Sequence, residues 1–118
     1  MKIDGIDLVD GNILKNMEAV NITAWVNFNG TGVVTIRDSY NISSVTDRGP
    51  GAYTVNFAVA MNNVDFSVTA TARILAAPTH VSFTDNARTV NSFEIDSFNH
   101  TPADADATMF NINICGGV

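Results

Sequence analysis

The sequence predicts an all-β protein: a compact antiparallel β-sandwich, jelly-roll or immunoglobulin-like, with about seven or eight strands and an extended N-terminal arm. Short segments alternate between apolar and polar residues with a period of two. Glycine- and proline-marked turns separate these segments at spacings of about ten residues, and no segment shows a helix-length apolar periodicity. A chain of 118 residues is expected to form one domain with a single core.

The first strands are predicted between residues 22 and 59. Alternation separates Trp25 from an apolar face on the first strand. The Asn29-Gly30 pair then predicts a hairpin, because both residues tolerate positive φ. Beyond the second strand, a polar passage over residues 39–46 leads to a turn at residues 47–51 and a third strand. The residues expected to face inward on these strands are Ile22, Ala24, Val26, Phe28, Val34, Ile36, Tyr53, Val55, Phe57 and Val59.

The second half of the chain repeats this pattern. Residues 64–74 alternate most regularly, and Pro78 ends that strand because proline cannot donate to a ladder. Further strands are expected at residues 81–83, 90–98 and 109–114. The inward-facing residues of the strands over 64–74, 90–98 and 109–114 are expected to be Val64, Phe66, Val68, Ala70, Ala72, Ile74, Phe93, Ile95, Phe110, Ile112 and Ile114.

Residues 1–20 differ from the rest and are interpreted as an arm or assembly segment, with the sandwich occupying residues 21–118. Glycines interrupt the apolar positions, so the segment is expected to lie extended along its own domain or a neighbouring subunit. Acidic residues recur every third position, whereas a calcium loop needs ligands at alternate positions, and no metal is expected. The apolar anchors of the arm are Ile3, Ile6, Leu8 and Ile13.

Composition excludes several classes of function. The net charge of −6 and the scattered basic residues argue against nucleic-acid binding. The one cysteine, Cys115, gives no internal disulfide or metal framework and is interpreted as a small apolar residue on the last strand. No apolar run is long enough to insert into a membrane. No signal peptide is visible, which indicates synthesis in a cytoplasm.

Catalytic signatures are also missing from the sequence. Glu94 and Asp96 share the outer face of a strand, and Asp104 and Asp106 share a loop. Neither pair has the apolar pocket that would raise one pKa for acid catalysis. There is no glycine-rich phosphate loop, zinc-protease motif or serine elbow. The sequence therefore predicts a non-enzymatic protein without a cofactor.

Four outward or loop residues are candidate contacts. Trp25 is either an anchor at a subunit interface or, if both faces of its strand are covered, a core residue. Tyr40, Arg48 and His100 are expected in exposed polar loops, where they either contact a host surface or another subunit or are merely solvated.

The run AWVNFNGTG, followed by IRDSYNISSVTDRGPGAYTVNF and then Met61, resembles a β-domain of tail-fibre and other virion proteins of tailed phages, often from aquatic hosts. The resemblance implies a structural protein of the virion, made in the host cytoplasm, that assembles as a homotrimer and contacts other virion proteins. As a fibre module, it would bind a host-surface glycan or protein through residues 40–51 and 100–106.

Two alternatives remain open. Because the domain starts at Met1 without a fibre shaft before it, the chain is alternatively a capsid cement or decoration protein bound to the major capsid protein. A free carbohydrate-binding β-sandwich is the other alternative. That function requires a cluster of exposed aromatic residues, for which the candidates are Trp25, Tyr40 and Tyr53.

Overall fold

The computed structural model describes residues 22–74, 78–83, 87–99 and 104–118, and these residues form a β-sandwich. The predicted arm over residues 1–20, with its anchors Ile3, Ile6, Leu8 and Ile13, lies outside the described residues, as does His100. The strands are β1 (Ile22–Asn29), β2 (Thr35–Tyr40), β3 (Ile42–Gly49), β4 (Ala52–Phe57), β5 (Ser67–Arg73), β6 (Thr79–Phe83), β7 (Ser92–Asn99) and β8 (Met109–Cys115).

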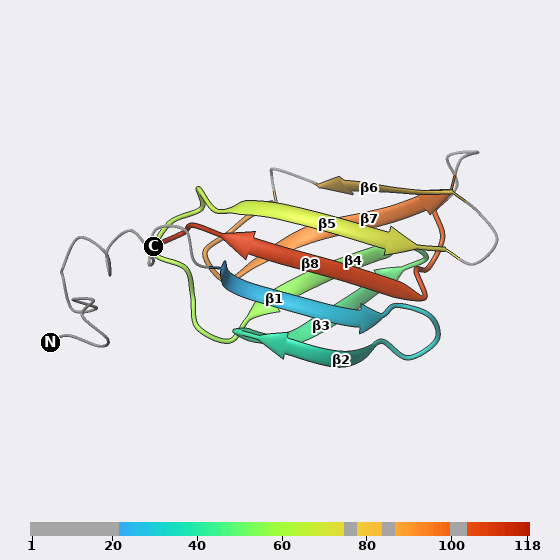
Figure 1. Cartoon of the computed structure of the whole chain (residues 1–118), viewed down its shortest axis with the longest axis horizontal. Helices are drawn as coiled ribbons and strands as arrows, with labels where there is room; N and C mark the ends of the chain where they lie inside the picture. Colours follow the sequence, from blue (N-terminus) through green and yellow to red (C-terminus); the bar gives the residue numbers. More distant parts are fainter. Residues whose placement is uncertain (1–21, 75–77, 84–86, 100–103) are drawn as a thin grey trace, which may run out of the picture.

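The strands form two four-stranded antiparallel sheets, with the orders β2-β1-β8-β5 and β3-β4-β7-β6 (Figure 1). The second order matches strands A-B-E-D of an immunoglobulin domain, and β5 and β8 take the places of strands C and F. In an immunoglobulin domain strand F lies between strand C and strand G, and G comes from the end of the chain. Here β8 lies between β5 and β1, so the place of strand G is taken by β1, from the start of the chain. The predicted sandwich is therefore confirmed, with an immunoglobulin-like strand order.

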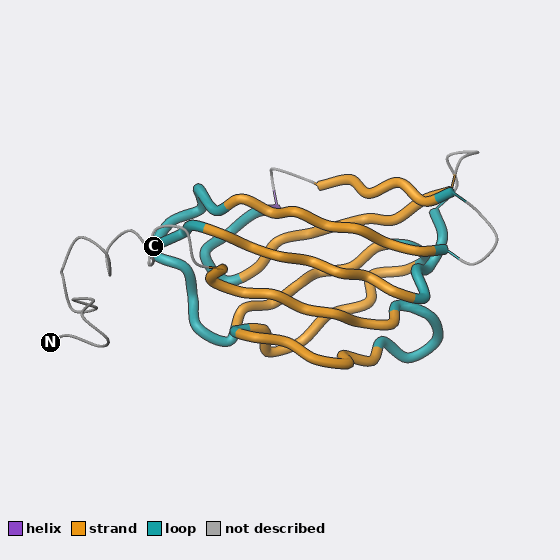
Figure 2. The backbone as a smooth tube through the Cα atoms, in the orientation of Figure 1, coloured by secondary structure: helices purple, strands orange, loops and turns teal. Residues whose placement is uncertain are grey.

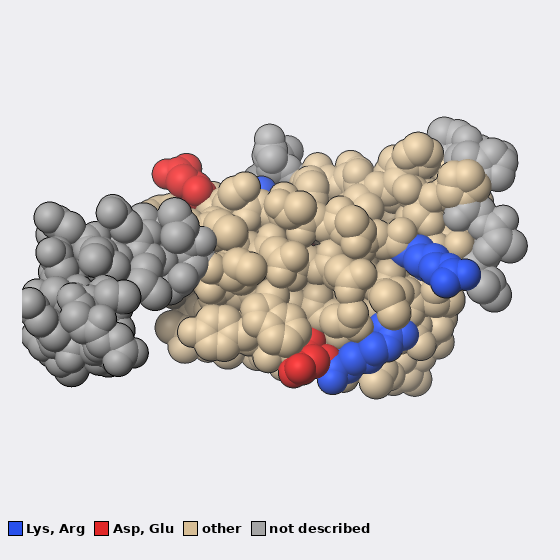
Figure 3. Space-filling model, viewed as in Figure 1, with Lys and Arg blue, Asp and Glu red and all other residues tan. Residues whose placement is uncertain are grey.

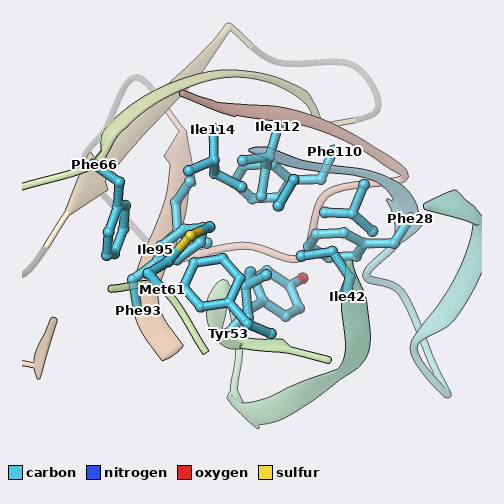
Figure 4. Packing of buried hydrophobic residues seen from close by; sticks show 14 of the residues in the cluster. Phe28, Ile42, Tyr53, Met61, Phe66, Phe93, Ile95, Phe110, Ile112 and Ile114 are labelled. Atoms are coloured by element: carbon cyan, nitrogen blue, oxygen red, sulfur yellow. The ribbon is translucent and has the colours of Figure 1, made fainter. Parts of the chain in front are cut away.

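The core lies between the sheets and contains two groups of aromatic rings (Figure 4). Full burial of a phenylalanine side chain stabilises the fold by about 1.5–3 kcal/mol, so these rings contribute much of the folding free energy. One group, with ring centroids 5.1 to 5.8 Å apart, consists of Phe28, Tyr53 and Phe110. The other, with centroids 5.3 to 6.0 Å apart, consists of Phe57, Phe66 and Phe93.

Alternation predicted the core faces of most strands correctly. The inward sides of β1, β4, β7 and β8 are buried as expected, because side chains on a strand point alternately to opposite faces. Val68, Ala70 and Ala72 of β5 pack against the core, as predicted. The confirmed fully buried positions are Ala24, Val26, Phe28, Tyr53, Val55, Phe66, Phe93, Ile95, Phe110, Ile112 and Ile114.

Some expectations were wrong at strand ends. Val59 was expected to face inward, but β4 ends at Phe57 and Val59 is 70% exposed. Ile22 is 44% exposed because the pairing of β1 with β8 shifts register between Ile22 and Ala24. The strand expected over residues 64–74 is shorter, since β5 covers Ser67–Arg73 and Val64 is exposed.

The prediction of a polar loop over residues 39–46 was also wrong. Residues Ile42–Gly49 form strand β3, which pairs with β4, and Tyr40 ends strand β2. Both strands lie at sheet edges, where most side chains face solvent and no apolar alternation is required. Tyr40 and Arg48 are thus strand residues.

The connections gather at two ends of the sandwich (Figure 2). At the end called here the Tyr53 end, the segment after β1 meets the segment before β8 through a hydrogen bond from Gly30 N to the Ala107 carbonyl, 2.8 Å. At the opposite, Val118 end, Asn62 N donates to the Gly117 carbonyl at 2.7 Å, which joins the β4–β5 connection to the C-terminal residues.

Candidate functional site

The two outer sheet faces differ in charge. The outer face of the β2-β1-β8-β5 sheet turns toward the viewer in Figure 3, and its middle carries no Lys, Arg, Asp or Glu. The charged side chains on this sheet lie at its margins, on edge strand β2 and at the end of β5. We call the uncharged part the neutral face; it consists of Trp25, Asn27, Tyr40, Thr69, Thr71, Asn111 and Asn113.

A chain of side-chain hydrogen bonds crosses the neutral face from β2 to β5. Arg37 Nη1 donates to Asn27 Oδ1 at 3.1 Å, and Asn27 Nδ2 donates to Asn111 Oδ1. Asn111 Nδ2 then donates to Thr71 Oγ1 at 3.4 Å. Arg37 Nη2 also donates to the Thr108 carbonyl at 2.7 Å. These bonds link all four strands of the sheet and fix the orientation of two asparagine side chains.

A second row of side chains runs beside this chain of hydrogen bonds, and its members make fewer side-chain hydrogen bonds. Tyr40 lies directly opposite Trp25, Trp25 opposite Asn113, and Asn113 opposite Thr69. Trp25 is half-buried, whereas the Tyr40 side chain is 58% exposed. Asn113 is exposed and makes no side-chain hydrogen bond with any residue that the structure describes. We call these residues the aromatic row.

The aromatic row brings together two residues that sequence reasoning had treated separately. Trp25 was a candidate interface or core residue, and Tyr40 a candidate loop contact; they are neighbours on one surface. Trp25 does not belong to the buried core. The asparagines of this face were expected only to point outward. Alternation gives that direction, but cross-strand partners depend on strand order and register.

Arg48 lies on the other sheet, away from the aromatic row. Its Nη2 donates to Asp96 Oδ1 at 3.0 Å and to the Tyr53 carbonyl at 3.2 Å, and Nη1 lies 3.6 Å from Glu94 Oε2. The carboxylates that sequence reasoning considered as a catalytic pair are therefore both engaged by one guanidinium. Such a partly exposed ion-pair network contributes about 0–1 kcal/mol per pair.

Tyr53, the third aromatic candidate for carbohydrate binding, is fully buried, so this expectation was wrong. Its hydroxyl lies 3.0 Å from the Gly30 carbonyl oxygen and 3.1 Å from Asp106 Oδ1, and it accepts a hydrogen bond from Ala107 N at 3.3 Å. Burial raises the pKa of the Tyr53 hydroxyl well above its ordinary value. The Asp106 charge raises this pKa further, while the bond from Ala107 lowers it. Tyr53 is therefore a structural residue of the Tyr53 end.

The Val118 end exposes a group of apolar side chains. Val59 is 70% exposed and Val118 66% exposed. Asn41 fixes the backbone at Val59, because its Oδ1 accepts from Val59 N at 2.7 Å and its Nδ2 donates to the Val59 carbonyl at 3.2 Å. Asn63 Nδ2 donates to the Val118 carbonyl at 3.1 Å. We call the group formed by Ile22, Val59, Val64 and Val118 the apolar end.

The described ranges contain no metal-binding cluster and no membrane-spanning helix. No three His, Cys, Asp or Glu side chains among these residues gather to hold a metal ion. Within the same residues, no helix has the length and apolar character needed to cross a membrane. In comparisons with protein-family models, curated proteins and solved structures, nothing matches the chain.

Proposed function

We propose that the chain is a non-enzymatic structural protein of a tailed-phage virion that assembles as a homo-oligomer, a trimer, in a tail-fibre or receptor-binding-like module. The sequence resemblance supports the virion setting and the trimer. The observation that carries the assembly part of the proposal is the apolar end. Exposed apolar side chains that gather on one part of a surface mark sites of protein–protein contact.

The apolar end suits a contact between subunits for two reasons. Hydrogen bonds from Asn41 and Asn63 hold the backbone next to the exposed valines, so the apolar surface is presented in a fixed arrangement. A preorganised surface loses less conformational entropy on association. In addition, Ile22 lies only two positions after residues 1–20, which the sequence predicts to be an assembly segment.

Closed symmetry would also protect the sheets. The edge strands β2, β5, β3 and β6 leave backbone groups available for pairing with other chains. A closed symmetric assembly can cover part of such edges and so limit uncontrolled association.

The test is the mass of the purified full chain by light scattering, combined with its location and copy number in purified phage particles. We expect a trimer and a copy number set by the symmetry of the tail. A copy number comparable with that of the major capsid protein would favour the cement alternative instead. A monomer that is absent from particles would contradict the virion proposal.

A pair of variants tests the role of the apolar end. The double variant Val59→Ser with Val64→Ser should shift the trimer toward monomer, because it removes exposed apolar surface without touching the core. Val33→Ser is the matched control, since Val33 is 88% exposed and lies in the loop after β1 at the Tyr53 end. Equal trimer stability in both variants would contradict the role of the apolar end.

A further inference from the structure

We propose that the aromatic row of the neutral face binds a neutral oligosaccharide, with Trp25 and Tyr40 stacking against sugar rings and Asn113 and Thr69 hydrogen-bonding to sugar hydroxyls. The binding itself follows from the chemistry of this surface. Only the identification of the sugar as a host-surface glycan rests on the proposed function.

The aromatic part of the row is a cross-strand pair. Residues directly opposite each other on antiparallel strands have Cβ atoms about 4.5–5.5 Å apart, so Trp25 and Tyr40 are cross-strand neighbours on the same face of the sheet. Both side chains have a large apolar ring and a polar atom at its edge. This combination matches a pyranose, which presents C–H groups on its faces and hydroxyls around its rim.

The polar part of the row supplies hydrogen bonds next to these rings. The Asn113 amide has two donor hydrogens and an acceptor oxygen, none of which is engaged by a described residue. A sugar hydroxyl can both donate and accept a hydrogen bond, so a side-chain amide can pair with it in either role. From Tyr40 to Thr69 the row crosses four strands and spans about 14 Å at the usual strand spacing, enough for a short oligosaccharide.

The strands that carry the aromatic row are held together next to it. The neighbouring hydrogen-bonded chain through Asn27 and Asn111 ties β1 and β8 together directly beside Trp25 and Asn113. A backbone that is already held in place loses little entropy when a ligand binds. Aromatic rings likewise have few rotatable bonds to immobilise.

Charge and polarity favour a neutral sugar over other occupants. An acidic glycan needs a cation in the row, but the nearest guanidinium on this sheet, that of Arg37, is bonded to Asn27 Oδ1 and the Thr108 carbonyl. A second copy of the chain would call for an apolar centre, because the buried core of a subunit interface is mostly apolar. Apart from Trp25, the two central strands and β5 present Asn and Thr side chains on this face instead.

The test is affinity electrophoresis of the full chain in native gels that contain dextran, mannan or galactomannan, with dextran sulfate as the acidic counterpart. The net charge of −6 drives the protein toward the anode, so binding to an uncharged polysaccharide appears as retardation. We expect retardation by at least one neutral polysaccharide and none by dextran sulfate. Tyr40→Ala and Asn113→Ala should each weaken that binding about tenfold, corresponding to the loss of one stacking or hydrogen-bonding contact.

Phe83→Ala is the matched control, since Phe83 is an exposed aromatic residue on β6 in the opposite sheet. Equal mobility in all gels, retardation by dextran sulfate alone, or equal weakening by Phe83→Ala would each overturn the proposal. Light scattering of Tyr40→Ala separates a sugar site from a subunit contact: a change from trimer to monomer would assign the row to a second copy and overturn the sugar proposal. Retained sugar binding in a chain that is absent from virions would contradict the proposed function and leave this inference intact.

Discussion

The hydroxyl of Tyr53 lies 3.1 Å from Asp106 Oδ1, although the two residues are 53 positions apart in the sequence. The same carboxylate oxygen accepts a hydrogen bond from Gly51 N at 2.8 Å. Tyr53 and Asp106 thus connect the β3–β4 turn to the segment that leads into β8, and the Gly30 carbonyl brings in the segment after β1. One buried phenol therefore organises the Tyr53 end of the sandwich.

Replacing this phenol should destabilise the protein measurably. Tyr53→Phe keeps the ring in the core but removes the hydroxyl that lies between the Gly30 carbonyl and Asp106 and that accepts from Ala107 N, and we expect a loss of about 1–3 kcal/mol in the free energy of unfolding. Urea denaturation measures this change. Tyr40→Phe is the control and should alter the free energy by less than about 0.5 kcal/mol, because Tyr40 is on the surface. Equal effects would contradict the assigned role.

Stability should also fall in alkaline solution because of Tyr53. Since the pKa of Tyr53 is raised in the folded state, its contribution is fully present below the ordinary tyrosine pKa of about 10 and is lost as pH rises above that value. We expect the free energy of unfolding of the wild type to decline above about pH 10, and to decline less steeply in Tyr53→Phe. If the free energy of unfolding falls equally with pH in both proteins, a group other than Tyr53 causes the decline.

Gly51 should tolerate no side chain. A Cβ atom at this position would lie 2.2 Å from the Ser97 carbonyl oxygen and 2.7 Å from Ala105 N, both of which are backbone atoms. We expect Gly51→Ala to cost about 3 kcal/mol or more, because the backbone of two segments must move.

Gly32 provides a control for the Gly51 variant. Its φ of +61° is close to the +66° of Gly51, but an added Cβ would meet nothing within 4 Å. Gly32→Ala should therefore cost only the backbone strain, about 1–2 kcal/mol. Thermal and urea unfolding of both variants measure the difference. Equal losses would mean that backbone conformation, not close packing, explains the glycine at position 51.

Two asparagines on the neutral face should respond differently to truncation. Asn27→Ala removes the bonds to Arg37 and Asn111 and is expected to lower the free energy of unfolding by about 1–2 kcal/mol. Asn113→Ala removes no bond to a described residue and should change it by less than about 0.5 kcal/mol. Urea denaturation compares the two, and a larger loss for Asn113→Ala would contradict the division of this face into two rows.

Much of the sandwich could be predicted from alternation alone. The inward direction of Phe110, Ile112 and Ile114 follows from the period of two, which is a local property of an extended backbone. The antiparallel pairing of β1 and β2 was likewise predicted, but not through a tight Asn29-Gly30 turn: the loop covers residues 30–34, and its positive φ lies at Gly32 rather than at Asn29 or Gly30. Strand β3 was missed because an edge strand that exposes most of its side chains carries little apolar periodicity.

The sequence predicted individual residues of the candidate site but not which of them are neighbours. Alternation indicated that Trp25 points away from the core-facing side of its strand, and composition indicated a surface rich in neutral polar residues. That Tyr40 lies on one side of Trp25 and Asn113 on the other depends on β8 inserting between β1 and β5, and on a register shift between β1 and β2. Local sequence determines which side of a strand is apolar. The tertiary structure decides which strands become neighbours, because pairing order depends on how two sheets bury their apolar faces together.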